Sequence, residues 1–216
     1  MSGELGAALR EQNEANRARI PDGTLAVMDG ATTALAATGL ADRCLAVGAQ
    51  APEFTLPDAT GADVALSSLL AQGPVVLAFY RGGWCPYCST ELRALQTRLG
   101  DITGSGANLV AVSPQTPDNS LSTAEKLELT FPVLSDAGNA VARSYGLVFT
   151  LPEDLRGVYD EFGLDVPAAN GDDTFELPLP ATFVIGTDGT VVWRFADADY
   201  TKRAEPDDVI AVLANL

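Results

Sequence analysis

The chain has 216 residues, of which 47% are hydrophobic, so it can bury a sizeable core in one domain with an extension. It carries 13 basic and 29 acidic residues, and this net charge of −16 argues against partners such as nucleic acid or an anionic membrane surface. Histidine is absent, which excludes catalytic pairs and metal sites that depend on histidine. Cysteine occurs three times, and this odd number disfavours a framework of structural disulfides.

The first 20 residues are charged and contain no apolar run of the roughly 7–15 residues that a secretory signal needs. No stretch approaches the roughly 20 apolar residues of a membrane-spanning helix. We therefore expect a cytoplasmic protein that does not bind membranes.

The sequence predicts a helical extension over residues 1–40 and a main domain over residues 41–216. Two helices are expected, at 4–19 and 24–38, because Pro21-Asp22-Gly23 interrupts the first pattern and Gly39 ends the second. The second helix is apolar on most sides. We expect it to pack on the core or on a partner, which makes a homodimer possible.

Strands and helices alternate through the main domain. The expected elements are a hairpin of 54–56 and 64–66, a strand at 75–80, one helix through Leu92, Leu95, Leu99 and Ile102, a strand at 108–112, a helix at 120–129, a strand at 132–134, a helix through 145, an excursion over 150–178 with a helix at 152–162, a hairpin of 181–185 and 191–195, and a helix opened by Pro206. This order, βαβαβ followed by ββα, predicts an α/β fold.

The pair Cys85-x-x-Cys88 follows the buried strand and opens a helix. A helix N-terminus stabilises a thiolate, and Pro86 suits the first helical position because its missing N–H costs nothing there. Arg81 adds positive charge four residues upstream. The spacing lets Cys85 attack a substrate and Cys88 resolve the product as a disulfide. Because so short a loop gains little stability from a disulfide, the pattern favours redox chemistry.

The remaining polar candidates each have two interpretations. A zinc site needs about four Cys or His ligands and only Cys44 is left to help, so we expect no metal. Cys44 itself is predicted to be a small buried hydrophobic residue, with a resolving or intermolecular thiol as the alternative. Glu91, one turn after Cys88, is either a solvated acid favoured by the helix dipole or a buried carboxylate that shuttles protons or positions Arg81.

The stretch from Val47 to Phe195 resembles the peroxiredoxin branch of the thioredoxin superfamily, the alkyl hydroperoxide reductase/thiol-specific antioxidant family. The segment GPVVLAFYRGGWCPYCSTEL is similar to the family's active-site strand, loop and helix, and FPVLSD and ATFVIGTDGTV are similar to later segments. The resemblance implies a thioredoxin-like fold, with a central mixed sheet flanked by helices, behind an N-terminal two-helix extension.

The resemblance also places individual residues. Arg81 falls where peroxiredoxins have the loop proline, Cys85 where they have threonine, and Cys88 at the peroxidatic cysteine. Glu91 falls on the family's glutamate. Pro180 replaces the family's later arginine and stands where thioredoxins have a cis-proline.

A cis Leu179–Pro180 bond is therefore expected. Arg194 and Arg203 are candidates to replace the family's arginine, although exposed strand and tail charges are the favoured interpretation for both. Tyr80 and Trp84 are expected to pack around the loop. Together with Pro180 they are the predicted substrate-binding residues, and Trp84 could form a docking platform for a redox partner.

The leading hypothesis is a thiol peroxidase without a cofactor that reduces hydrogen peroxide or organic hydroperoxides, with Cys85, Cys88, Arg81 and Glu91 as catalytic residues. The cysteines would form a disulfide, which thioredoxin or glutathione with glutaredoxin would reduce. Alignment favours Cys88 as nucleophile, whereas exposure and helix-end electrostatics favour Cys85, which we prefer. The alternatives are a thioredoxin-like thiol–disulfide oxidoreductase acting on protein or glutathione disulfides, and a redox-sensing interaction protein.

Overall fold

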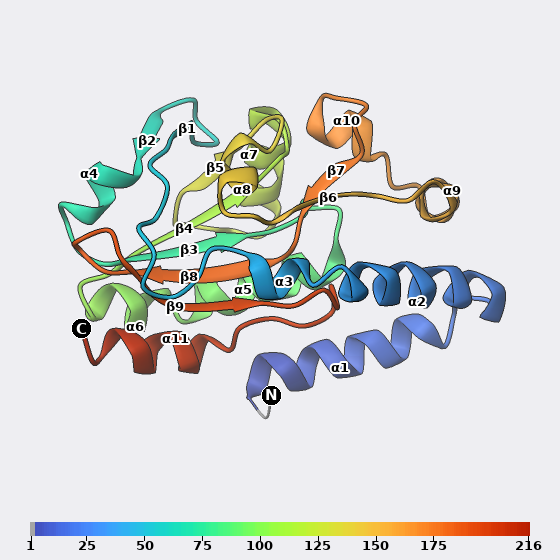
Figure 1. Cartoon of the computed structure of the whole chain (residues 1–216), viewed down its shortest axis with the longest axis horizontal. Coiled ribbons are helices and arrows are strands. Elements are labelled where there is room, and N and C mark those ends of the chain that lie inside the picture. The colour runs from blue at the N-terminus through green and yellow to red at the C-terminus, as the bar shows by residue number, and fades with distance from the viewer. Residues whose placement is uncertain (1–2) are drawn as a thin grey trace.

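A five-stranded mixed sheet forms the centre of the computed structural model, which describes residues 3–216 (Figure 1). The strand order is β5-β4-β3-β8-β9, with β3, β4 and β5 parallel and β8 and β9 antiparallel to their neighbours. The strands are β3 (Val75–Phe79), β4 (Asn108–Ser113), β5 (Val133–Ser135), β8 (Ala181–Ile185) and β9 (Val191–Ala196). This confirms the α/β, thioredoxin-like arrangement predicted from the sequence.

The sheet is covered on both faces, so its central strand is apolar throughout rather than alternating with polar residues. All five residues of β3 are buried. Val76 and Ala78 point into a core shared with α5, α6 and α11, whereas Val75 and Leu77 point into a second core on the opposite face. The CxxC segment begins directly after this strand, so a rigid buried element holds its base.

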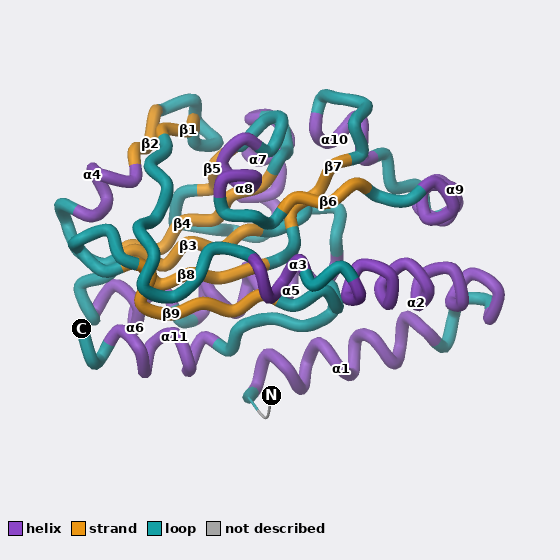
Figure 2. Tube along the Cα trace, viewed as in Figure 1, coloured by secondary structure: helices purple, strands orange, loops and turns teal. Residues whose placement is uncertain are grey.

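Helices and short hairpins surround the sheet (Figure 2). The helices of the main domain are α3 (Leu40–Arg43), α4 (Leu66–Leu70), α5 (Pro86–Thr97), α6 (Leu99–Gly104), α7 (Pro117–Lys126), α8 (Ala140–Ser144), α9 (Glu153–Glu161), α10 (Val166–Asn170) and α11 (Pro206–Leu213). The hairpins are β1 (Thr55–Pro57) with β2 (Asp63–Ala65) and β6 (Val148–Thr150) with β7 (Glu176–Pro178).

Three details differ from the sequence prediction. The helix expected to run through Ile102 is divided into α5 and α6 at Arg98, whose φ of −98° and ψ of 8° leave the helical region. Helix α7 begins at Pro117 rather than at 120, because Thr116 caps it through the backbone N–H of Asn119. The excursion over 150–178 contains α10 in addition to the expected helix, α9, and it ends in β7, which pairs with β6.

The two-helix extension is confirmed as α1 (Glu4–Arg17) and α2 (Asp22–Ala37). Helix α1 packs on α5: the Tyr87 hydroxyl donates to Asn13 Oδ1 at 3.0 Å, and the Thr90 hydroxyl donates to Gln12 at 2.8 Å. Its first turn donates two backbone N–H groups to the Glu205 carboxylate. Division into two domains at residue 40 stays a prediction, as does the homodimer.

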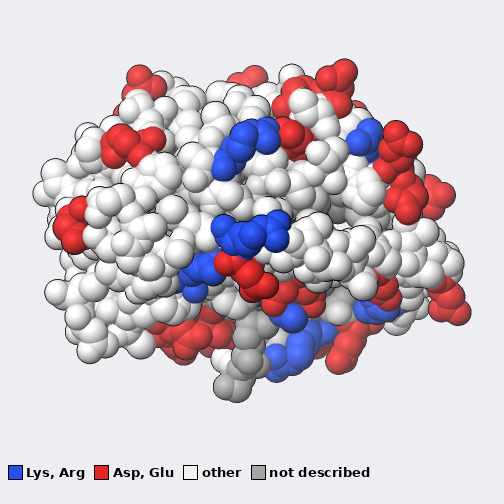
Figure 3. Space-filling model, viewed as in Figure 1, with Lys and Arg blue, Asp and Glu red and all other residues white. Residues whose placement is uncertain are grey.

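Acidic side chains lie around the rim of the face in Figure 3, with fewer Lys and Arg side chains near its middle. None of the helices within residues 3–216 is long and apolar enough to cross a membrane. Over the same residues, no group of three or more Cys, Asp or Glu side chains is arranged as metal ligands.

Candidate active site

Helix α5 begins at the cysteine pair. Cys85 is its N-cap, with φ of −86° and ψ of 114°, and Pro86 is its first residue. Cys85 and Cys88 are both free thiols, and each has 0% of its surface exposed. The expectation that Cys85 is exposed is therefore wrong: the aromatic side chains of Trp84, Tyr87 and Tyr200 pack into the same core as the two sulfurs.

Arg81 contacts the first sulfur. Its Nη2 donates to Cys85 Sγ at 3.2 Å, and its Nη1 donates to the Tyr159 hydroxyl at 2.8 Å. The guanidinium lies 4.5 Å from the Tyr200 ring centroid and 5.3 Å from that of Trp84, which favours the cation in this buried place. Cys85 thus has a fixed positive charge at hydrogen-bond distance.

Arg203 contacts the second sulfur from the loop between β9 and α11. Its Nη2 donates to Cys88 Sγ at 3.1 Å, and its Nε forms a 2.5 Å ion pair with Glu91 Oε2. Arg203 and Glu91 are 1% and 2% exposed, respectively, so the interpretations of Arg203 as an exposed tail charge and of Glu91 as a solvated acid are wrong. Two backbone carbonyls, of Tyr200 and Lys202, accept from Arg203 Nη1 and hold it in place.

The charges around the pair shift the pKa values of the two thiols in opposite directions. Burial favours the neutral form of Cys85, but the Cys88 thiol hydrogen bond and the charges of Arg81 and Arg203 outweigh it and hold the Cys85 pKa well below its ordinary value. Burial and the adjacent Cys85 anion raise the Cys88 pKa well above its ordinary value. Burial also raises the pKa of Glu91 to about 6, against the lowering effect of Arg203. These surroundings therefore favour ionisation of Cys85 over ionisation of Cys88.

The other predicted residues are more widely spread. Trp84 is half-buried and its ring meets Tyr159 edge-on, with 5.6 Å between the ring centroids. Tyr80 is buried in the core beneath the loop and lines neither of the cavities described below. Pro180 is buried beside one cavity, and the Leu179–Pro180 bond is trans, because residues 3–216 contain no cis peptide. The cis bond expected from thioredoxins is thus not found.

Arg194 lies away from the cysteine pair and contacts Cys44. Its Nη1 donates to the Ala41 carbonyl at 3.0 Å and to the Cys44 sulfur. Cys44 is 2% exposed, in agreement with its interpretation as a small buried residue, and burial raises its pKa. Between the two candidate arginines, only Arg203 contacts a CxxC sulfur.

Two cavities flank Arg81. One, of about 220 Å³, lies between α2 and the β6 region, and the other, of about 510 Å³, lies between the end of α1 and the Trp84–Tyr87 segment. Both are lined by Arg81, Tyr159, Tyr200 and Met28. Tyr159 and Tyr200 were not identified from the sequence. Nothing marks Tyr159 there, whereas Tyr200 lies in the tail segment that also carries Arg203.

Residues 47–194 match the model of the AhpC/TSA family. Chloroplastic peroxiredoxin Q of Sedum lineare is 34% identical over 169 residues, which is 78% of this chain and 78% of that protein. The crystal structure of peroxidoxin BcpB from Mycobacterium tuberculosis aligns with a TM-score of 0.62 and 27% identity, over 79% of this chain and 97% of that one. Peroxiredoxin Q of Xanthomonas campestris, at 21% identity, aligns with a TM-score of 0.56 over 75% of this chain and 90% of that one, a likeness of fold. The chain therefore belongs to the AhpC/TSA family and is a peroxiredoxin-like thiol peroxidase.

Proposed function

We propose that this thiol peroxidase reduces hydrogen peroxide and organic hydroperoxides through a Cys85–Cys88 dithiol–disulfide cycle, with Cys85 as the nucleophile. The observation that carries the proposal is the Arg81 guanidinium 3.2 Å from Cys85 Sγ at the start of α5. A thiolate is the reactive form of cysteine. Arg81 stabilises it on Cys85, whereas Arg203, which contacts Cys88, already pairs with the Glu91 carboxylate.

In the first step the Cys85 thiolate attacks the terminal oxygen of the hydroperoxide. The S–O bond forms as the O–O bond breaks, so sulfur is oxidised by two electrons to a sulfenic acid. The departing alkoxide, or hydroxide from hydrogen peroxide, takes up one proton, which balances the proton that Cys85 released on ionising. Arg81 stabilises the developing negative charge because it lies at the sulfur before the reaction begins.

In the second step Cys88 attacks the Cys85 sulfenic acid. The S–S bond forms, the S–O bond breaks, and the hydroxyl leaves as water with the Cys88 proton. Arg203 lies 3.1 Å from Cys88 Sγ and favours its thiolate as that proton departs. Glu91 acts as a positioning residue, because its carboxylate fixes the Arg203 Nε.

Regeneration needs two electrons from thioredoxin or from glutathione with glutaredoxin. Because both sulfurs are 0% exposed in the dithiol form, the reductant reaches the disulfide only after local movement of α1, α2 or the first turn of α5. We place the thiol–disulfide oxidoreductase function second, because the match to the AhpC/TSA family supports a peroxide as the oxidant.

Sulfenic acid trapping tests the order of the two cysteines. Cys85→Ser and Cys88→Ser proteins are treated with hydrogen peroxide in the presence of a sulfenic acid reagent, and the modified peptide is identified by mass spectrometry. Cys88→Ser should accumulate the adduct at Cys85, because its resolving thiol is gone, whereas Cys85→Ser should stay unmodified. The parent chain should form the Cys85–Cys88 disulfide.

Two outcomes would contradict the proposal. An adduct at Cys88 in the Cys85→Ser protein alone would reverse the roles, and the absence of any adduct in both proteins would reject direct reaction of this pair with peroxide. A Cys44→Ser protein is the matched control, since Cys44 contacts Arg194 rather than Arg81 or Arg203. It should retain both steps.

A further inference from the structure

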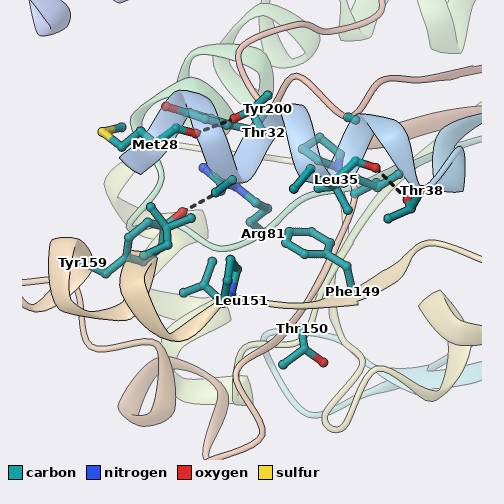
Figure 4. A pocket seen from close by; sticks show the side chains of 17 residues that line it. Met28, Thr32, Leu35, Thr38, Arg81, Phe149, Thr150, Leu151, Tyr159 and Tyr200 are labelled. Carbon is teal, nitrogen blue, oxygen red and sulfur yellow. Dashed lines mark hydrogen bonds between the residues drawn. The ribbon is translucent and has the colours of Figure 1, made fainter. Parts of the chain in front are cut away.

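The cavity between α2 and the main domain has an apolar lining. Met28 and Leu35 of α2 face Phe149 and Leu151 across it, and Arg81 lies between the two sides (Figure 4). Its volume is about 220 Å³. An apolar cavity of roughly 150 Å³ is enough to admit benzene, so this one accommodates a ring or a branched alkyl group.

Thr32 of α2 and Thr38, the C-cap of that helix, line the cavity but do not make it polar. The Thr32 hydroxyl donates to the Met28 carbonyl at 3.0 Å, and the Thr38 hydroxyl donates to the Leu35 carbonyl at 2.6 Å. Each hydroxyl is therefore satisfied within its own helix. An occupant of the cavity meets apolar surface over most of its length.

Polar groups meet the occupant at Arg81. The Arg81 side chain is 95% buried, since only 5% of its surface is exposed, and its Nε has no hydrogen-bond partner within residues 3–216. Its other two nitrogens are engaged by Tyr159 and Cys85. The cavity thus combines an apolar body with one charged wall, the Arg81 guanidinium that contacts Cys85.

We propose that this cavity binds the apolar substituent of an organic hydroperoxide and directs the peroxide group to Arg81 and Cys85. This rests on the proposed function above and adds a substrate preference to it: hydroperoxides with an aromatic or branched substituent are preferred over hydrogen peroxide. The preference comes from the extension, because α2 lies outside residues 47–194, which match the family model.

Filling the cavity tests the preference. Ala31 lines it, whereas Ala26 lies on the same helix, is exposed and lines neither of the two cavities. Ala31→Phe and Ala26→Phe are therefore a matched pair with the same added volume. With dithiothreitol as reductant, kcat/KM is measured for cumene hydroperoxide and for hydrogen peroxide. Ala31→Phe should lower the value for cumene hydroperoxide by at least about tenfold, the effect of lost apolar contacts, and change that for hydrogen peroxide less than about twofold.

A binding measurement separates the cavity from the chemistry. The product alcohol 2-phenyl-2-propanol has no O–O bond to react, and its affinity is measured by calorimetry with the parent chain and both variants. The parent chain and Ala26→Phe should bind it at least about tenfold more tightly than Ala31→Phe does.

Equal kcat/KM losses for the two peroxides in Ala31→Phe, or no loss for either, would overturn the substrate preference. A parent chain that binds the alcohol no more tightly than it binds methanol would also overturn it, even if Ala31→Phe did not fold. Failure of the proposed function gives a different result, because the parent chain would then bind the alcohol while neither peroxide oxidised the cysteine pair.

Discussion

Replacing Arg81 with methionine should raise the pKa of Cys85. Two unit charges 3.2 Å apart attract each other by roughly 5 kcal/mol at an effective dielectric constant of about 20. At about 1.4 kcal/mol for each pKa unit, the full attraction corresponds to a rise of nearly four. Arg203 still acts on Cys85, and water enters the vacated space, so we expect the pKa to rise by at least about two.

The measurement uses a Cys44→Ser/Cys88→Ser background, so that one thiol remains and the serine that replaces Cys88 keeps a hydroxyl donor beside it. The rate of alkylation by iodoacetamide is followed from pH 3 to 10, with and without Arg81→Met. Arg93→Met is the matched control, since Arg93 is exposed on α5. A Cys85 pKa that moved by less than about 0.5 in Arg81→Met, with circular dichroism unchanged, would refute the assignment of Arg81 as the stabilising charge.

Three further predictions concern stability, and urea denaturation measures each of them. Burial holds the pKa of Glu91 at about 6 against its usual 4.5, so the folded protein keeps a proton that the unfolded chain has released. The free energy of unfolding should therefore fall by about 2 kcal/mol as the pH rises from 4.5 to about 6. Glu91→Gln should remove this pH dependence. A Glu91→Gln protein with the same pH dependence as the parent chain would contradict the prediction. Arg203→Met should lower the free energy of unfolding by about 3–5 kcal/mol, because it leaves Glu91 buried and unpaired. Arg143→Met breaks an exposed pair with Glu176 and should lower it by less than about 1 kcal/mol. Similar losses in the two variants would show that burial of the ion pair does not matter here. Gly83→Ala should lower the free energy of unfolding by about 1–3 kcal/mol, because the added Cβ would lie 2.2 Å from Thr123 Oγ1. In Gly30→Ala the added Cβ contacts no other atom, and the better helix propensity of alanine in α2 should raise the free energy of unfolding by about 1 kcal/mol. Equal effects of the two substitutions would rule out the clash at Thr123.

The central elements of the fold were predictable because each has a strong local pattern. The continuous apolar run of β3 marked a strand covered on both faces, and Pro86 marked the start of α5. The hairpin of β6 with β7 was not predictable, because its strands of three residues are too short to show an alternation of apolar and polar residues with a period of two. The break at Arg98 interrupts a heptad-like apolar face that continues past it, so the pattern gave no sign of it.

The site was predictable where residues are near in sequence. Arg81, Cys85 and Cys88 lie within eight positions, and their contacts follow from the strand-to-helix turn. Arg203 is 115 positions from Cys88, and only the folding of the tail beneath α5 brings them together. Tyr159 approaches Arg81 from the excursion in the same way. The burial of Cys85 could not be predicted, because it depends on tyrosines contributed by distant segments.

The pairing of each sulfur with its own arginine has a consequence for the energetics of the redox couple. A disulfide carries no charge, so its formation removes the anion that Arg81 contacts, while Arg203 keeps its ion pair with Glu91. The buried Arg81 cation is thus compensated only in the dithiol state. Groups that stabilise the reduced form make a disulfide more oxidising. The reduction potential of a Cys85–Cys88 couple should accordingly be more positive with Arg81 in place than with an uncharged residue at position 81.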